Sequence, residues 1–134
     1  FISYFIITSE GNLLIGGFDG MTLYIKDGDN NFTKTDRIDG IPFARVQTIE
    51  AGLIENTYWI GTRDEGLYLV SGSGDDPADY TAKQVGEDHG LQYSSIPTIM
   101  VDNAGFLWIS DFGKGVGRPY DFSDRSSSID DHSL

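Results

Sequence analysis

The sequence contains no cysteine among its 134 residues, so neither a disulfide framework nor a thiolate metal site can form. It also lacks long apolar runs: YFIIT and LYLV fall far short of the ~20 residues that a membrane-spanning helix needs. The start, FISYFIITSEGN, has neither the basic region nor the cleavage site of a signal peptide, and it has no Met. We therefore expect no direct membrane insertion by this segment, and we interpret the chain as a piece of a longer protein.

Basic residues are few, and this deficit limits the partners of the chain. Nine Lys and Arg stand against 21 Asp and Glu, which gives a formal net charge of −12 at pH 7. Nucleic acid and anionic membrane surfaces repel such a chain, so we expect neither as a partner. The simplest interpretation of the charge is solubility.

The composition that remains is that of one packed domain rich in turns. Hydrophobic residues make up 39% and aromatic residues 13% of the chain, which is enough for a core. Sixteen of the 21 acidic residues are Asp, a turn former, and there are 17 Gly. Many turns and few helices are therefore expected.

Three segments of the chain follow one pattern: ITSEGNLLIGGFDGMTLYI, IEAGLIENTYWIGTRDEGLYLV and IMVDNAGFLWISDFGKGVGR. Each has an apolar residue, an acidic or Gly/Asn turn, a short apolar run ending in a small residue, a Gly-containing break and a second apolar run. The anchors Leu14, Trp59 and Trp108 are 45 and 49 residues apart. This period is in the range of a four-stranded propeller blade.

The segments between these copies also correspond, since RIDGIPFARVQTI matches GEDHGLQYSSIPTI. In the second unit, strands are predicted around residues 46–49, 58–61, 67–70 and 80–85. The sequence therefore predicts an all-β fold, a β-propeller fragment of about three four-stranded antiparallel blades in an incomplete ring, because closed rings usually take 4 to 8 blades. The predicted divisions are blade 1 at 1–36, starting within its first strand, blade 2 at 37–85, partial blade 3 at 86–120, and a polar tail at 121–134 for which disorder is an open alternative.

Stacking of such blades buries faces that a lone meander would leave in water, and aromatic side chains fill the space between sheets. We expect this packing role for four residues, with ligand stacking by either Trp as the alternative: Tyr58, Trp59, Phe106 and Trp108. Four glycines are interpreted as turn residues that need positive φ or a close backbone approach: Gly61, Gly66, Gly105 and Gly115.

The motifs DNAGFLWIS with GKGVGR, and NTYWIGTRDEGLYLV, resemble the two-component regulator propeller repeat. DGIPFARVQTI and HGLQYSSIPTI resemble the Gly-Leu-Pro approach that precedes each such repeat, and the resemblance covers about residues 4–118. It implies a ligand-sensing, non-enzymatic propeller segment of a bacterial hybrid histidine kinase, on the periplasmic or extracellular side of an inner-membrane protein. The ligand implied is a saccharide or another small molecule.

The copies depart from this family pattern in places. The first has Leu14 in place of Trp and Gly17 in place of Thr, with two extra residues before Leu23. The third has Ser110 and Asp111 in place of Gly-Thr, and its third strand is predicted to be weak.

Alternate turns of an up-and-down meander fall at the same end of the sheet. The turns between the second and third strands therefore share one rim with the connections at residues 36–45 and 86–95, and we expect a ligand on this rim because loops on a rigid sheet commonly carry function. The candidate ligand-binding residues are Arg63, Asp64, Glu65, Asp111, Lys114, Arg45, His89 and, in the first unit, Asp19. For any one of them, a solvated loop residue is the competing interpretation.

No metal, cofactor or catalytic residue is predicted. DGDNN at residues 27–31 offers oxygen ligands at positions one, three and five of an EF-hand-like loop, but Phe32 replaces the required Gly and Ile38 the required Glu. A hairpin turn is expected there, and also for SGSGDDPAD at residues 71–79. His89 and His132 are too isolated to suggest a metal site.

Two other function classes stay open. VDNAGFLW partly resembles the Asp-box turn of glycoside hydrolase and lyase propellers, but Gly105 lies three residues after Asp102, where that box has two, and no pair of catalytic carboxylates can be nominated. The other alternative is a non-catalytic propeller that binds proteins. The expected partners are a small-molecule or oligosaccharide ligand and the remaining blades of the same propeller, with a homodimer left open.

Overall fold

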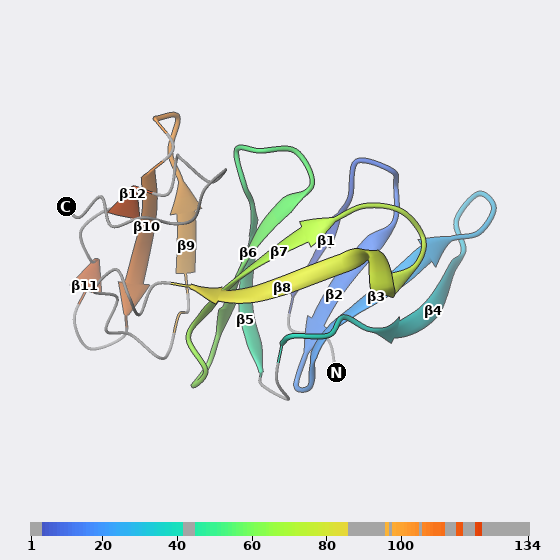
Figure 1. The fold of residues 1–134 in the computed structure, drawn as a ribbon, viewed down its shortest axis with the longest axis horizontal. Helices are drawn as coiled ribbons and strands as arrows, with labels where there is room; N and C mark the ends of the chain where they lie inside the picture. Colours follow the sequence, from blue (N-terminus) through green and yellow to red (C-terminus); the bar gives the residue numbers. More distant parts are fainter. Residues whose placement is uncertain are drawn as a thin grey trace.

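The computed structural model describes residues 4–41, 45–85, 96, 98–104, 106–111, 115–116 and 120–121. They form three antiparallel four-stranded sheets that do not close into a ring, as predicted (Figure 1). Sheet 1 contains β1 (Tyr4–Ile7), β2 (Leu13–Gly17), β3 (Gly20–Lys26) and β4 (Phe32–Arg37). Sheet 2 contains β5 (Val46–Ala51), β6 (Thr57–Thr62), β7 (Leu67–Gly72) and β8 (Tyr80–Val85), with the 3-10 turn η1 (Pro77–Asp79) before β8. Sheet 3 contains β9 (Thr98–Val101), β10 (Phe106–Asp111), β11 (Gly115–Val116) and β12 (Tyr120–Asp121).

Sheets 1 and 2 are regular meanders in which each strand pairs with the next along the chain. Their inner strands carry consecutive apolar residues, and because successive side chains point to opposite faces, both faces of each sheet are apolar. The residues 27–31 connect β3 and β4 as a hairpin turn closed by the Asp27 N–H donating to the Asn31 carbonyl over 2.7 Å. The predicted hairpin interpretation is therefore confirmed at this loop.

Sheet 3 differs from the other two in its last strands. Ser110 pairs with Thr98 on one edge of β10 and with Val116 on the other, while Leu107 pairs with Val101 and with Tyr120. The strands β11 and β12 therefore follow one another along the same edge of β10, as an interrupted third strand. The residues between them, 117–119, lie outside the described part of the chain.

Two apolar cores lie between successive sheets. The first joins sheets 1 and 2 and includes Leu14, Leu23, Ile60 and Tyr58. The second joins sheets 2 and 3, and Trp59 lies in it with only 3% of its surface exposed. The predicted packing role is thus confirmed for Tyr58 and Trp59. Their side chains point from β6 to opposite sides, Tyr58 toward sheet 1 and Trp59 toward sheet 3.

Strand pairing aligns the three units residue by residue. Gly16 pairs with Met21 in sheet 1, and Gly61 pairs with Leu67 in sheet 2, so Met21 and Leu67 occupy equivalent positions. The alignment that placed two extra residues before Leu23 is therefore wrong, because the β2–β3 turn is short rather than long. The alignment from sequence alone was misplaced because both Met21 and Leu23 are apolar and fit the same core position in the pattern; both are buried.

A glycine on the second strand of sheet 1 lets it approach sheet 2 closely, and a glycine on the second strand of sheet 2 lets it approach the segment before β9. A Cβ atom at Gly16 would lie 2.6 Å from a methyl group of Val46, and one at Gly61 would lie 2.5 Å from the Ile96 carbonyl oxygen. Such distances leave no room for a side chain. The close-approach interpretation is confirmed for Gly61, whereas Gly66 has a φ of +86° and makes a turn.

Among the described residues, no helix has the length and apolar character needed to cross a membrane.

Candidate functional site

The β2–β3 and β6–β7 turns lie at the same end of their sheets, the lower end in Figure 1, where β5 also begins. This is the rim on which the sequence predicts a ligand. Five residues of these segments form what we call the rim site: Phe18, Asp19, Arg37, Arg45 and Arg63.

An exposed aromatic ring lies at the centre of the rim site. Phe18 is in the two-residue turn between β2 and β3, and 55% of its surface is exposed. The Arg45 guanidinium lies over this ring, 5.3 Å from its centroid, within cation–π distance. The Arg63 backbone N–H donates to the Arg45 carbonyl over 2.9 Å. This hydrogen bond joins the β6–β7 turn to the residue that lies over Phe18.

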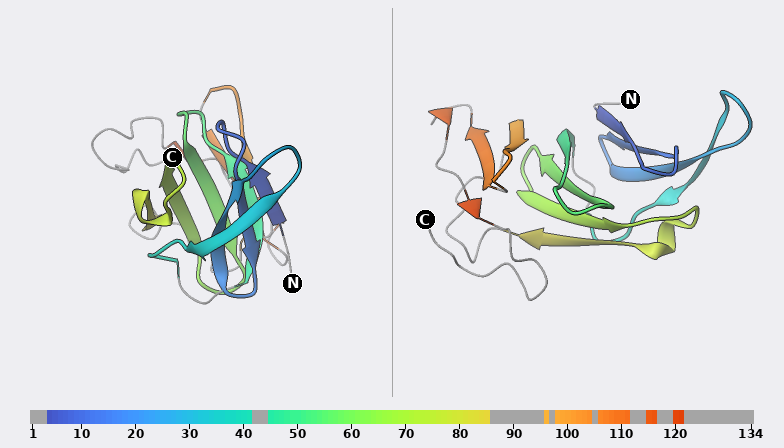
Figure 2. Two further views of the ribbon diagram at one scale, coloured as in Figure 1. Left: turned by 90° about the vertical axis from the view of Figure 1, so that its right-hand side faces the viewer. Right: turned by 90° about the horizontal axis from the view of Figure 1, so that it is seen from above.

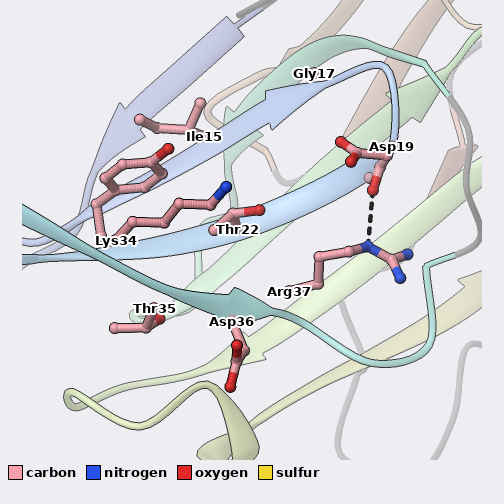
Figure 3. Close-up of a pocket in the computed structure, with 10 residues that line it drawn as sticks. Ile15, Gly17, Asp19, Thr22, Lys34, Thr35, Asp36 and Arg37 are labelled. Atoms are coloured by element: carbon pink, nitrogen blue, oxygen red, sulfur yellow. Dashed lines mark hydrogen bonds between the residues drawn. The ribbon is translucent and has the colours of Figure 1, made fainter. Parts of the chain in front are cut away.

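Arg37 fixes the two loops of the first unit to each other. Its Nε donates to the Asp19 carbonyl and its Nη2 to the Ile41 carbonyl, each over 2.8 Å. Figure 3 shows the Arg37 side chain reaching back from the end of β4 to the turn that carries Asp19. The turn and the β4–β5 connection are therefore held together by a cation whose side chain spans both.

The β6–β7 turn is held by its own hydrogen bonds. Thr62 is fully buried, and its hydroxyl group donates to the Gly66 carbonyl over 2.7 Å. The Thr62 hydroxyl oxygen also accepts the Glu65 N–H over 3.0 Å. The Gln84 side chain donates to the Glu65 carbonyl from β8. The turn is thus fixed while the side chains of Arg63, Asp64 and Glu65 are exposed.

Glu65 also acts on a neighbouring tyrosine. Burial raises the pKa of Tyr68, and the charge of Glu65 raises it further. The Glu65 carboxylate therefore lies close enough to β7 to affect a phenol beneath the rim.

The predicted candidates fall into two groups. The structure places Asp19 next to Phe18 in one turn and the Arg45 guanidinium over the Phe18 ring. Arg63 is joined to Arg45 by a backbone hydrogen bond, with Asp64 and Glu65 following it in the β6–β7 turn. His89 and Lys114 lie outside the described residues, and Asp111 is described only as the last residue of β10.

Sequence reasoning missed Phe18 and Arg37. Phe18 stands inside GGFDGM, and an aromatic residue between two turn glycines was a usable signal that we assigned to no role. Arg37 gave no signal, because an Arg at the end of an edge strand is ordinarily solvated.

A hollow of about 540 Å³ lies on the face of sheet 1 that points away from sheet 2. Its lining includes Ile15, Thr22, Tyr24 and Lys34 on the sheet, and it extends to Asp19 and Arg37 at the rim. In Figure 3, Ile15, Thr22 and Lys34 gather over the strands. The hollow therefore borders the rim site at Asp19 and Arg37. It lies on the face of sheet 1, whereas the rim site lies at the ends of the strands.

The opposite rim carries a polar network that joins sheets 1 and 2. Asn12 is 3% exposed; its Oδ1 accepts the Lys26 N–H, and its Nδ2 donates to the Gly74 carbonyl and to Asp75 Oδ1. The Glu10 carboxylate accepts the Gly74 N–H over 2.6 Å. These polar groups are already paired, so this rim offers fewer unused contacts to a ligand.

Tyr80 completes this network. Its hydroxyl donates to the Gly74 carbonyl over 2.9 Å. Burial, with the charges of Glu10 and other nearby groups adding to it, raises the pKa of Tyr80 to about 12. The phenol is therefore held in its neutral, hydrogen-bonding form.

The carboxylate of the Asp-box-like segment has a structural task. One oxygen of Asp102 accepts the N–H groups of Ala104 and Phe106, and the other accepts the Trp108 indole N–H over 2.8 Å. Asp102 thereby closes the β9–β10 turn and fixes the Trp108 ring. Within the described ranges, no three His, Cys, Asp or Glu side chains are placed to hold a metal ion.

Comparison with models of known families finds none that matches the chain, and a search of curated proteins finds no significant match.

Proposed function

We propose that this chain is a ligand-binding segment of an extracytoplasmic sensor propeller of a two-component system, and that its ligand is a saccharide or a similar polar small molecule. The observation that carries the proposal is the rim site. There the Arg45 guanidinium lies over an exposed phenyl ring, and Arg37 and Arg63 are joined to the adjoining segments, in a chain whose net charge is −12.

The rim site combines the two kinds of contact that such a ligand needs. The exposed face of Phe18 offers an apolar surface for a sugar ring, while Arg63 offers hydrogen-bond donors that suit hydroxyl and carboxylate oxygens. Its loops are held by Arg37 and Thr62, so few rotatable segments need to be ordered on binding. The guanidinium groups of Arg45 and Arg63 also suit a carboxylate or sulfate on a ligand. Asp19, Asp64 and Glu65 on the same rim are available to accept from its hydroxyl groups.

The hydrolase alternative receives less support. Asp102, the carboxylate that carries the Asp-box resemblance, uses both oxygens to hold its own turn and the Trp108 ring. A glycoside hydrolase needs two carboxyl groups facing one substrate. The rim site instead contributes mainly cations and an aromatic ring, which suits binding.

The proposal is tested by titrating the chain with a panel of neutral, carboxylated and sulfated oligosaccharides, with binding followed by calorimetry. We expect at least one acidic oligosaccharide to bind, and we expect Phe18→Ala and Arg63→Ala each to weaken it by about tenfold, since such contacts contribute about 1–2 kcal/mol. The melting temperature of both variants should stay close to that of the wild type, because both side chains are exposed.

Lys83→Ala is the matched control, since Lys83 is an exposed cation on β8 away from the rim turns. It should bind the same oligosaccharide as tightly as the wild type. No binding by any member of the panel, or equal affinity of the wild type and both rim variants, would contradict the proposal.

A further inference from the structure

The rim opposite the rim site is strongly acidic. Its β1–β2 and β5–β6 turns lie at the upper end of the sheets in Figure 1, and the β3–β4 and β7–β8 connections belong to the same ends of their strands. The connecting segments contain seven Asp and Glu and no Lys or Arg: residues 8–12, 27–31, 52–56 and 73–79. Such a composition attracts cations, in contrast to the rim site with its three arginines.

One polar group on the opposite rim is buried without a hydrogen-bond partner. Tyr58 is the second residue of β6, and only 4% of its surface is exposed. Among the described residues, no group forms a hydrogen bond with its hydroxyl. Tyr80, in the same core, differs because its hydroxyl donates to the Gly74 carbonyl. Since a buried polar group without a partner is costly, the Tyr58 hydroxyl marks a place where a ligand supplies the missing hydrogen bond.

Two exposed carboxylates lie near the Tyr58 hydroxyl. Burial raises the pKa of Tyr58, and the charges of Glu10 and Glu55 raise it further. Ser9 Oγ donates to Asn56 Oδ1 over 3.1 Å, and this hydrogen bond holds the turns that carry the two carboxylates together. The hydroxyl and both carboxylates are therefore gathered where the ends of sheets 1 and 2 meet.

This place is internal to the row of sheets. The right-hand view of Figure 2, from above, shows sheet 2 between sheets 1 and 3, and the first core joins sheets 1 and 2. Further blades of a propeller would cover the outer faces of sheets 1 and 3, and they would leave the strand ends at this junction accessible. The arrangement is therefore the same for any number of blades.

An apolar surface adjoins the carboxylates. Leu53 and Ile54 precede Glu55 in the β5–β6 turn, and they are 55% and 44% exposed. The turn is fixed, because the Thr57 hydroxyl donates to the Ile54 carbonyl over 2.6 Å and the Gly52 N–H donates to the Thr57 carbonyl over 2.9 Å. Two exposed aliphatic side chains beside a carboxylate suit the methylene chain of a ligand whose end is a cation.

We propose that the opposite rim binds an aliphatic amine with at least two ammonium groups. An ammonium group has three N–H donors and no acceptor. One such group donates to the Tyr58 hydroxyl oxygen and to the carboxylates of Glu10 and Glu55. The methylene chain that follows it lies along Leu53 and Ile54.

The β7–β8 loop supplies carboxylates for the second ammonium group. Asp75 and Asp79 are exposed on this loop. Burial raises the pKa of Tyr80, and the charges of Glu10, Asp75 and Asp79 are among those that add to this effect. The loop carboxylates therefore lie on the same side of the junction as Glu10. Free polyamines and the lysine side chains of a partner protein both offer the required chemistry.

Calorimetric titration of the chain with spermidine, and separately with the peptide trilysine, tests the proposal. A salt concentration of about 150 mM screens non-specific attraction to the net charge of −12. We expect at least one amine to bind, and Mg²⁺ to bind at least about tenfold more weakly, because the described residues place no three acidic side chains for a metal ion. Tighter binding of spermidine supports a free polyamine as the ligand, and tighter binding of trilysine supports a partner protein.

Three variants remove the proposed contacts one at a time. Glu10→Gln and Glu55→Gln each remove one charge at nearly constant size, so each should weaken amine binding about tenfold. Tyr58→Phe removes only the hydroxyl and should weaken it about fivefold. Asp39→Asn is the matched control, since Asp39 is exposed between β4 and β5, outside the turns of this rim. It removes the same charge as Glu10→Gln and should change the affinity by less than about twofold.

Stability separates a binding role of the Tyr58 hydroxyl from a structural one. Because this hydroxyl has no partner among the described residues, Tyr58→Phe should keep or raise the melting temperature. Tyr80→Phe should lower it, since that variant loses a hydrogen bond. A fall in Tyr58→Phe as large as that in Tyr80→Phe would show a structural hydroxyl and overturn the proposal.

Four results of the titrations would also overturn it. They are no binding of either amine, Mg²⁺ bound as tightly as the amines, an affinity unchanged by Tyr58→Phe, and equal weakening by Asp39→Asn and Glu10→Gln, which would show a diffuse effect of charge. None of these variants changes a residue of the rim site. The outcome is therefore separate from that of the oligosaccharide titration.

Discussion

The two rims of sheets 1 and 2 use polar residues in opposite ways. On one rim, Asn12 and Tyr80 are buried and both donate to the Gly74 carbonyl, Asn12 from the neighbouring sheet and Tyr80 from the same one. On the other, Asp64 and Arg63 are exposed on a turn that is held by the buried Thr62. The difference shows that one rim joins neighbouring sheets, while the other has fixed loops whose side chains remain accessible.

The largest loss of stability is expected for a substitution of Asn12, on the rim that joins the two sheets. Asn12→Ala removes the acceptor of the Lys26 N–H and both contacts to the β7–β8 loop, so we expect a loss of about 2–3 kcal/mol in the free energy of unfolding. Asp64→Ala on the opposite rim should change it by less than about 0.5 kcal/mol. Urea denaturation of both variants measures the difference, and equal losses would show that the two rims are not distinct.

Tyr80→Phe should have an intermediate effect that depends on pH. It removes the hydrogen bond to the Gly74 carbonyl and should cost about 1 kcal/mol at neutral pH. The pKa of Tyr80 is raised from 10.0 to about 12, so the folded state keeps the proton that the unfolded state loses in between. This contribution is complete below pH 10 and is lost as pH rises toward 12.

Denaturation of wild type and Tyr80→Phe at pH 8, 10 and 11.5 checks this sign. The gap between the two proteins should narrow as pH rises, even though other tyrosines titrate in both. A gap that stays constant or widens with pH would show that the neutral phenol is not what the network requires.

The smallest effect concerns the contact between Arg45 and Phe18. Because the ring is exposed, we expect a coupling energy of only about 0.5 kcal/mol from the double-mutant cycle of Arg45→Gln and Phe18→Leu. Thermal or urea unfolding of the four proteins measures it. A coupling above about 2 kcal/mol would mean that this rim also serves mainly to hold the sheets together.

The sequence was sufficient to predict the parts of the fold that repeat. The recurring run around Leu14, Trp59 and Trp108 located the second strand of each sheet, and the alternation in YTAKQV located β8, at residues 80–85. These elements depend on local patterns that the chain uses more than once. A pattern found three times constrains strand positions more tightly than any single stretch can.

The parts that could not be predicted depend on contacts between distant residues. The contacts of Asn12 with Gly74 and Asp75 cross more than sixty residues, and nothing near Asn12 in the sequence indicates them. Of the candidate site, the rim turns were predicted, but the position of the Phe18 ring beneath Arg45 required the β4–β5 connection to be placed in space. The interrupted third strand of sheet 3 was foreseen only as weak, since a shared edge of β10 is a property of pairing and not of composition.

The glycines at positions 16 and 61 have a consequence for the curvature of the whole assembly. Each allows one edge of a sheet to approach the next, and the spacing at that edge, relative to the spacing elsewhere, determines the angle between neighbouring sheets. A methyl group at either position would widen the spacing where the sheets converge and so reduce the angle between them, and a smaller angle closes a circle with more sheets. The number of blades in a ring built from this repeat therefore depends in part on the absence of a side chain at Gly16 and Gly61.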